Sequence, residues 1–244
     1  MINRSIITPD SSEDLSFINT SYNLSTSIEF HNKETYLNTI KNITFVPRSG
    51  THNNFIKKEE VILYVINGEL SYSDSLSNNL LLKKGNMIYI NGGDGLSYDI
   101  FNNGIDYLDI IEISTCINMG QPSISSSSLN YMTPFIVPSS LNNEPENFLK
   151  YRVSSKKGLA PIKSFCDINI YSLTLKENEE IDFEVKKDRT AFLLQGYGLS
   201  LMKADITSLE FDLKGSDGLK ICSESFTLSS ELTSDFILVE CPSF

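Results

Sequence analysis

The chain has 244 residues and a mass of 27.4 kDa, which is enough for one large or two small globular domains. Thirty-one acidic and twenty basic side chains leave a formal charge of −11, which disfavours nucleic-acid binding because phosphate backbones are repelled. No apolar run approaches the ~20 residues that a membrane span needs. The first residues contain no apolar signal-peptide region, so we expect a cytoplasmic protein that binds neither membranes nor nucleic acid.

Alternating patterns dominate the first half of the chain. Residues 61–74 read as a strand, a turn at Asn67 and Gly68, and a return strand, which is the pattern of a β-hairpin. Residues 80–90 and 107–114 carry further strands. Turn signals recur roughly every 8–12 residues, which is typical of sandwiches and barrels.

The same pattern continues in the second half. It predicts strands at residues 167–175 and in five later segments: 181–186, 190–202, 209–213, 218–223 and 235–240. Helical periodicity is absent beyond a single turn near residues 145–149. The sequence therefore predicts an all-β fold.

The serine-rich segment Ser123–Asn130 lies near the midpoint, between two series of strands. Its composition is typical of a solvated connection between domains. We therefore predict two domains, residues 1–130 and 131–244.

The cysteines carry no recognisable site. Cys116, Cys166, Cys222 and Cys241 are scattered without a C-x-x-C pair, so we expect reduced thiols rather than a zinc or redox centre. His31 and His52 are the two histidines of the chain, which leaves few bases for a catalytic cysteine.

One acidic pair and one glycine-rich segment are weaker candidates for a functional site. Glu59 and Glu60 stand side by side at the start of a strand, and we expect one solvated and one structural carboxylate rather than a general-acid pair. The Gly92–Gly95 segment resembles a phosphate-binding loop, but no helix follows it, so a tight turn is expected.

One stretch, Gly50–Asn103, carries a set of motifs in a recognisable order. The matching residues are Gly50-Thr51-His52, Tyr64-Val65, Gly68, Asp74-Ser75, Gly85, Gly93 and Gly95. In this order they resemble the first barrel of the pirin family, in particular its bacterial quercetinase-like members. Residues 189–201 and 215–242 resemble the second barrel of the same family.

The resemblance implies a bicupin, two jelly-roll-like β-barrels packed against each other. It also implies that N-terminal residues cross to brace the second barrel. Family members with the complete motif hold iron or another divalent metal in the first barrel, with three histidines and one glutamate. Imidazole and carboxylate ligands suit such a metal, and its open positions admit substrate or oxygen. Some of these proteins oxidise quercetin.

The ligand positions themselves depart from the family pattern. The second motif places Tyr98 where the family has a histidine and Ile100 where it has the glutamate. For the first motif two registers compete: without a gap the two histidine positions become Asn54 and Ile56, whereas a two-residue insertion makes them His52 and Asn54. We favour the insertion because a loop before a strand absorbs extra residues at low cost.

These replacements predict a degenerate metal site with no bound metal or other cofactor. Strand alternation places Tyr98 and Ile100 on one face and turns Asp99 away, so Asp99 does not substitute as a ligand. His52, Asn54, Ile56, Tyr98 and Ile100 are then the candidate lining of a ligand pocket.

We expect a monomeric, non-catalytic protein that binds a small apolar or aromatic molecule or contacts another protein. The alternative is a quercetin 2,3-dioxygenase-type oxygenase that uses a non-standard ligand set around His52.

Overall fold

The computed structural model describes residues 30–31, 37–116, 135–137, 150–156, 160–206, 208–215, 217–222 and 224–243. These residues divide into two compact units, which we call the N-terminal unit (30–137) and the C-terminal unit (150–243). They contain no helix, and hence none that could span a membrane. The predicted all-β class is confirmed. The expected turn at 145–149, the serine-rich connection and the N-terminal brace lie outside the described residues.

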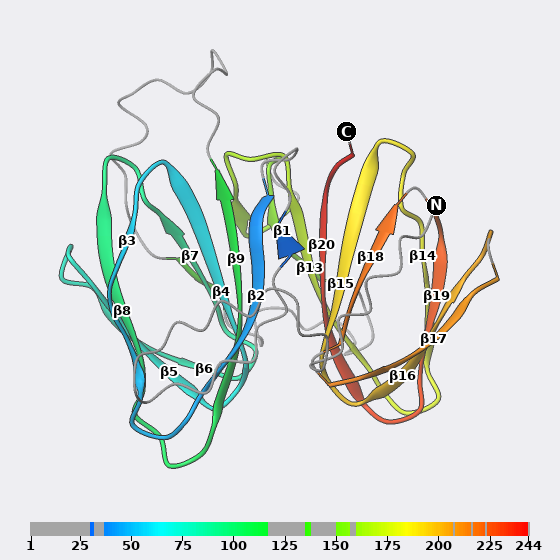
Figure 1. The fold of residues 1–244 in the computed structure, drawn as a ribbon, viewed down its shortest axis with the longest axis horizontal. Helices are drawn as coiled ribbons and strands as arrows, with labels where there is room; N and C mark the ends of the chain where they lie inside the picture. The colour runs from blue at the N-terminus through cyan, green and yellow to red at the C-terminus, as the bar shows by residue number, and fades with distance from the viewer. Residues whose placement is uncertain are drawn as a thin grey trace. The chain divides into compact units, whose positions relative to one another are not determined.

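The N-terminal unit consists of two facing antiparallel sheets (Figure 1). The six-stranded sheet has the order β1-β2-β9-β4-β7-β10, and the four-stranded sheet has the order β3-β8-β5-β6. The strands are β1 Phe30–His31, β2 Leu37–Phe45, β3 Gly50–Ile56, β4 Glu59–Asn67, β5 Glu69–Asp74, β6 Asn79–Lys83, β7 Met87–Asn91, β8 Leu96–Asn102, β9 Leu108–Cys116 and β10 Phe135–Val137.

The C-terminal unit repeats this arrangement. Its six-stranded sheet has the order β12-β11-β13-β20-β15-β18, with β11 and β12 parallel, and its four-stranded sheet has the order β14-β19-β16-β17. The strands are β11 Lys150–Ser154, β12 Ile162–Lys163, β13 Asn169–Leu175, β14 Glu180–Phe183, β15 Arg189–Tyr197, β16 Leu199–Ala204, β17 Glu210–Lys214, β18 Gly218–Cys222, β19 Phe226–Ser230 and β20 Ser234–Pro242.

The predicted hairpin at Asn67 and Gly68 is wrong. β4 pairs with β7 and β9, whereas β5 pairs with β6 and β8, so the chain crosses from one sheet to the other at Gly68. Gly68 has a φ of +84°, and a Cβ there would lie 2.8 Å from the carbonyl oxygen of Tyr107. The Asn-Gly pair therefore builds a corner of the jelly roll rather than a two-residue hairpin turn.

Within the described residues, no strand pairing joins the two sheets of either unit. Each unit is therefore a two-sheet jelly roll, as the resemblance implied, and the described strands do not close into a continuous barrel. The expected domain boundary after residue 130 lies outside the described residues, and the assignment of 131–244 to the second domain stays a prediction. β10, which follows that point, pairs with β7 of the N-terminal unit.

Each unit has its hydrophobic core between its two sheets. In the N-terminal unit, β4 contributes Val61, Leu63 and Val65 to this core, and the facing β8 contributes alternate residues from Leu96 to Ile100. In the C-terminal unit the corresponding core is a separate cluster. The inward positions of these strands therefore face the interior of the jelly roll. The pocket predicted from the sequence belongs to this interior.

Candidate functional site

Tyr98 and Ile100 lie inside the N-terminal jelly roll. They alternate along β8 with residues that face outward, and only 4% and 2% of their surfaces are exposed. Ile56 at the end of β3 belongs to the same buried cluster. Three of the five positions predicted for the pocket are therefore brought together in an apolar environment.

Asn54 lies directly opposite Tyr98 in the β3–β8 ladder. Its side-chain amide donates to Thr51 Oγ1 at 2.7 Å and to the Tyr98 carbonyl oxygen at 3.1 Å. The first of these hydrogen bonds lies within β3 and the second joins β3 to β8, so together they tie the amide to the sheet. Asn54 therefore lies beside the buried cluster in a structural role, because both hydrogens of its amide are already donated to protein acceptors.

His52 does not join these residues, contrary to the register that we favoured. Between the pairs Thr51–Ile100 and Asn54–Tyr98, two residues of β3 stand opposite the single residue Asp99, which is a β-bulge. The bulge contains Asn53 at a φ of +56° and turns His52 to the outer face, where 65% of its side chain is exposed. The bulge does add one extra residue to β3. With this residue accommodated in the bulge, Ile56 rather than His52 faces the interior.

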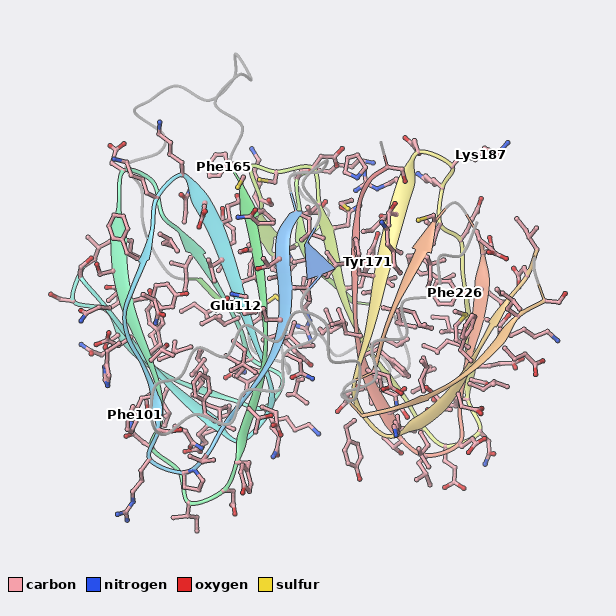
Figure 2. All side chains as sticks on the ribbon, in the orientation of Figure 1. Phe101, Glu112, Phe165, Tyr171, Lys187 and Phe226 are labelled. Carbon is pink, nitrogen blue, oxygen red and sulfur yellow. The ribbon has the colours of Figure 1, made fainter. Side chains whose placement is uncertain are left out.

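The structure adds polar side chains that the sequence analysis missed. Lys41 on β2 and Glu112 on β9 form an ion pair, with Nζ and Oε1 3.3 Å apart, and both face the interior in register with core residues of their strands. Glu59 on β4 faces the same interior. We call Lys41, Glu59 and Glu112 the interior polar cluster. In Figure 2, Glu112 lies between the two sheets of the unit.

The interior polar cluster influences the Tyr98 phenol electrostatically. Burial raises the pKa of Tyr98 above its ordinary value, and the charges of Glu112 and Glu59 raise it further. Burial and the neighbouring Glu112 also raise the pKa of Glu59, while Lys41 lowers it. Tyr98 is therefore a neutral phenol at physiological pH, and deprotonation inside the jelly roll is strongly disfavoured.

Glu60, the neighbour of Glu59, lies on the opposite face of the sheet. It is fully buried, and its carboxylate accepts hydrogen bonds from the Tyr89 hydroxyl at 2.6 Å and from Thr115 Oγ1 at 3.0 Å. The expectation of one structural carboxylate is thus met by Glu60. Glu59 is half-buried inside the jelly roll rather than solvated, because alternation along β4 turns it toward the core.

The residues at the expected ligand positions do not fit a transition metal. Ile56 and Ile100 offer no donor atom, Asn54 offers a weak amide, and Tyr98 is held in its protonated form. Among the described residues, no three histidine, cysteine, aspartate or glutamate side chains are grouped closely enough to bind a metal ion. The donor set therefore differs in kind from the three imidazoles and one carboxylate that the family resemblance implies.

The C-terminal jelly roll has an apolar interior at the corresponding strand. By strand order β19 corresponds to β8, and its inward residues Phe226 and Leu228 are buried in the core. Phe183 on β14 packs against Phe226 with ring centroids 5.5 Å apart. Inward positions of β8 and β19 are thus occupied in both units by side chains that pack rather than coordinate.

The chain matches no protein-family model and no curated protein sequence. Its fold, however, matches several solved structures. The bacterial pirin YhhW of Escherichia coli, solved in complex with nickel(II), is 16% identical, with 93% of this chain and 94% of that chain covered and a TM-score of 0.70. GK1651 of Geobacillus kaustophilus is 14% identical, with 91% and 90% covered and a TM-score of 0.73.

The fold is that of the pirin-like bicupins. A quercetin 2,3-dioxygenase of Acinetobacter baumannii shares it at 13% identity, with 84% of this chain and 74% of that chain covered and a TM-score of 0.64. At these identities the likeness establishes the architecture of this bicupin and leaves its chemistry to its own residues.

Proposed function

We propose that this protein is a non-catalytic bicupin whose N-terminal jelly roll binds a small molecule with an apolar or aromatic body. The observation that carries the proposal is the composition of the former metal positions. Where the family resemblance expects three histidines and a glutamate, this chain has Asn54, Ile56, Tyr98 and Ile100, and the last three are buried in one apolar cluster.

The interior polar cluster gives such a ligand a second point of contact. The side chains of Lys41 and Glu112 are 29% and 14% exposed, so solvent reaches this part of the interior. Tyr98 interacts electrostatically with Glu112 and Glu59, which places the phenol near the polar groups. A small number of polar groups beside an apolar wall is the usual composition of a small-molecule site.

The test uses the purified full-length protein in two measurements. Elemental analysis should find iron, nickel, copper and zinc well below one equivalent per chain, and quercetin should keep its flavonol absorbance in oxygenated buffer. A fluorescence titration with quercetin itself, as an aromatic probe, should then show saturable binding that an Ile100→Glu substitution weakens.

A full equivalent of metal together with oxygen-dependent loss of the flavonol would instead establish a metal-dependent oxygenase with a non-standard ligand set, and would overturn the proposal. Metal-free protein that binds neither quercetin nor other flat aromatic probes would also overturn it, because the interior would then be a closed core.

A further inference from the structure

A groove of about 620 Å³ lies on the outer face of the four-stranded sheet of the N-terminal unit. It is separate from the interior of the jelly roll, because its lining includes the outward residues of β8 and β5: Asp99, Phe101, Ser71 and Ser73. A smaller hollow of about 240 Å³ adjoins it and shares Ser73 and Asp99.

The floor of the groove contains flat apolar surface. The rings of Phe101 and His52 lie with centroids 6.0 Å apart and an interplanar angle of 33°, so they form a gently bent platform. Leu81 on β6 lies across Ser71 from Phe101 and adds further apolar surface, with 54% of it exposed. In Figure 2, Phe101 lies at the outer side of β8. An exposed aromatic face of this kind binds flat C–H surfaces as well as other rings.

The walls of the groove carry neutral hydrogen-bonding groups. Ser71 and Ser73 contribute hydroxyls, and Asn103 contributes an amide whose Nδ2 donates to Ser71 Oγ at 2.5 Å. An amide has two donor hydrogens and a carbonyl acceptor, so this bond leaves donor and acceptor capacity on Asn103, and Ser71 keeps its own hydroxyl hydrogen. The groove therefore presents hydroxyl and amide groups beside an aromatic platform.

The charge in the groove disfavours anionic ligands. Asp99 Oδ1 accepts a hydrogen bond from the backbone N–H of Asn53 at 2.7 Å, and Asp99 Oδ2 lies 3.5 Å from His52 Nδ1. Both carboxylate oxygens thus have partners within the protein. Among the described residues that line the groove there is no lysine or arginine, so an anionic ligand would meet a carboxylate without a compensating cation.

We propose that this outer groove binds a neutral saccharide. A pyranose ring has an apolar C–H face that matches the Phe101–His52 platform and a rim of hydroxyls that matches Ser71, Ser73 and Asn103. The Asp99 carboxylate lies against Nδ1 of His52, which leaves Nε2 of the imidazole for a sugar hydroxyl. This inference concerns a different face of the protein from the jelly-roll interior and does not depend on the function proposed for it.

The test is an array of neutral and anionic oligosaccharides probed with the full-length protein, followed by calorimetric titration of the best neutral oligosaccharide. Phe101→Ala should weaken binding about tenfold, which is the loss expected for one aromatic contact of about 1.4 kcal/mol. Leu81→Ser, at an exposed position that folding tolerates, should weaken it severalfold. Phe55→Ala is the matched control, because Phe55 is a 64% exposed aromatic on the same sheet but does not line the groove.

Three results would overturn the proposal. One is the absence of binding to every neutral oligosaccharide at millimolar concentration, and another is a preference for anionic ones. The third is neutral binding that Phe101→Ala and Leu81→Ser leave unchanged while both variants melt cooperatively, since the saccharide would then bind elsewhere.

Discussion

The ring of Tyr98 stacks on the ring of Tyr72, with centroids 5.9 Å apart and an interplanar angle of 25°. The Tyr72 hydroxyl donates to Asp74 Oδ2 at 3.0 Å, which fixes that ring at the end of β5. Burial raises the pKa of both phenols, so the pair is neutral. An uncharged aromatic pair therefore occupies the part of the interior where the family resemblance places a metal-binding imidazole.

Rebuilding the metal site tests which residues face the interior. A variant with Asn54→His, Ile56→His, Tyr98→His and Ile100→Glu carries three imidazoles and one carboxylate on inward positions. We expect it to bind nickel(II) with a stoichiometry near one, as measured by calorimetry and elemental analysis. The variant without Ile56→His, which retains His52, should bind at least about tenfold more weakly, because the β-bulge holds His52 on the outer face.

Equal nickel affinity of these two variants would contradict the placement of His52 outside. A folded four-residue variant that stays free of nickel would contradict the convergence of the four positions. Circular dichroism in the absence of nickel separates these outcomes from loss of folding.

The carboxyl group of Glu59 should make stability depend on pH. Because burial and Glu112 raise its pKa in the folded protein, the folded state binds the proton more tightly than the unfolded state does. The free energy of unfolding therefore falls as pH rises from the ordinary carboxyl pKa of 4.5 through the raised pKa, and the loss is complete above it. Glu59→Gln removes this loss, so its melting temperature should exceed that of the wild type at pH 7.

At pH 4, where Glu59 is protonated in both states, the wild type and Glu59→Gln should melt at nearly the same temperature. Glu177→Gln, at an exposed turn position, serves as the control and should show no such difference between pH 4 and pH 7. A Glu59→Gln variant that is less stable than the wild type at pH 7 would mean that the pairing of Glu59 with Lys41 outweighs burial.

A buried ionic network in the C-terminal unit should be sensitive to the loss of Arg189. Its Nη1 donates to Asp167 Oδ1 at 3.1 Å and its Nη2 to the Glu240 carbonyl at 3.2 Å, while Nε lies 3.5 Å from Glu240 Oε1. The carboxylate of Glu240 is buried and also accepts hydrogen bonds from Asn169 and Tyr171. Arg189→Ala should lower the free energy of unfolding by about 3 kcal/mol, because it leaves this carboxylate without its cation.

Urea denaturation at pH 7 measures this loss. Lys203→Ala removes an ion pair with Glu210 whose side chains are both more than half exposed, and its cost should stay below about 1 kcal/mol. Similar costs for the two substitutions would show that the network around Glu240 is solvated.

The corner at Gly68 should not accept a larger residue. Its φ of +84° is unfavourable for residues with a Cβ, and that Cβ would lie 2.8 Å from the Tyr107 carbonyl oxygen. Gly68→Ala should therefore destabilise the protein by about 1–3 kcal/mol. Gly215→Ala, where the nearest atom to an added Cβ is 3.6 Å away, should change stability by less than about 0.5 kcal/mol. Equal stabilities of the two variants in thermal unfolding would contradict the close approach at the corner.

Local patterns predicted the strands better than their partners. The two-residue period of β8 correctly placed Tyr98 and Ile100 on one face and Asp99 on the other, because alternation is a property of the single strand. The hairpin assigned to Asn67 and Gly68 failed, because strand pairing depends on which sheet receives each strand. That choice rests on long-range burial, which a turn motif does not encode.

The polar side chains inside the N-terminal unit had only a faint signal. Glu112 lies on the same face of β9 as the inward residues Leu108 and Ile110. An acidic residue on an otherwise apolar face is the signal from which its inward position could have been predicted. Lys41 carried no comparable sign, because its strand has a mixed pattern of burial. Their ion pair joins residues 71 positions apart and is visible only in the assembled sheet.

The sequence by itself determined the all-β class and the chemistry at Tyr98 and Ile100, since strand period and residue type are local properties. Only the tertiary structure decided between His52 and Ile56. A single extra residue in β3 is absorbed as a bulge opposite Asp99, and the bulge shifts the alternation so that His52 faces solvent while Ile56 faces the core. The physical reason is that a one-residue change in register exchanges the two faces of a strand, and only the neighbouring strand sets where that exchange occurs.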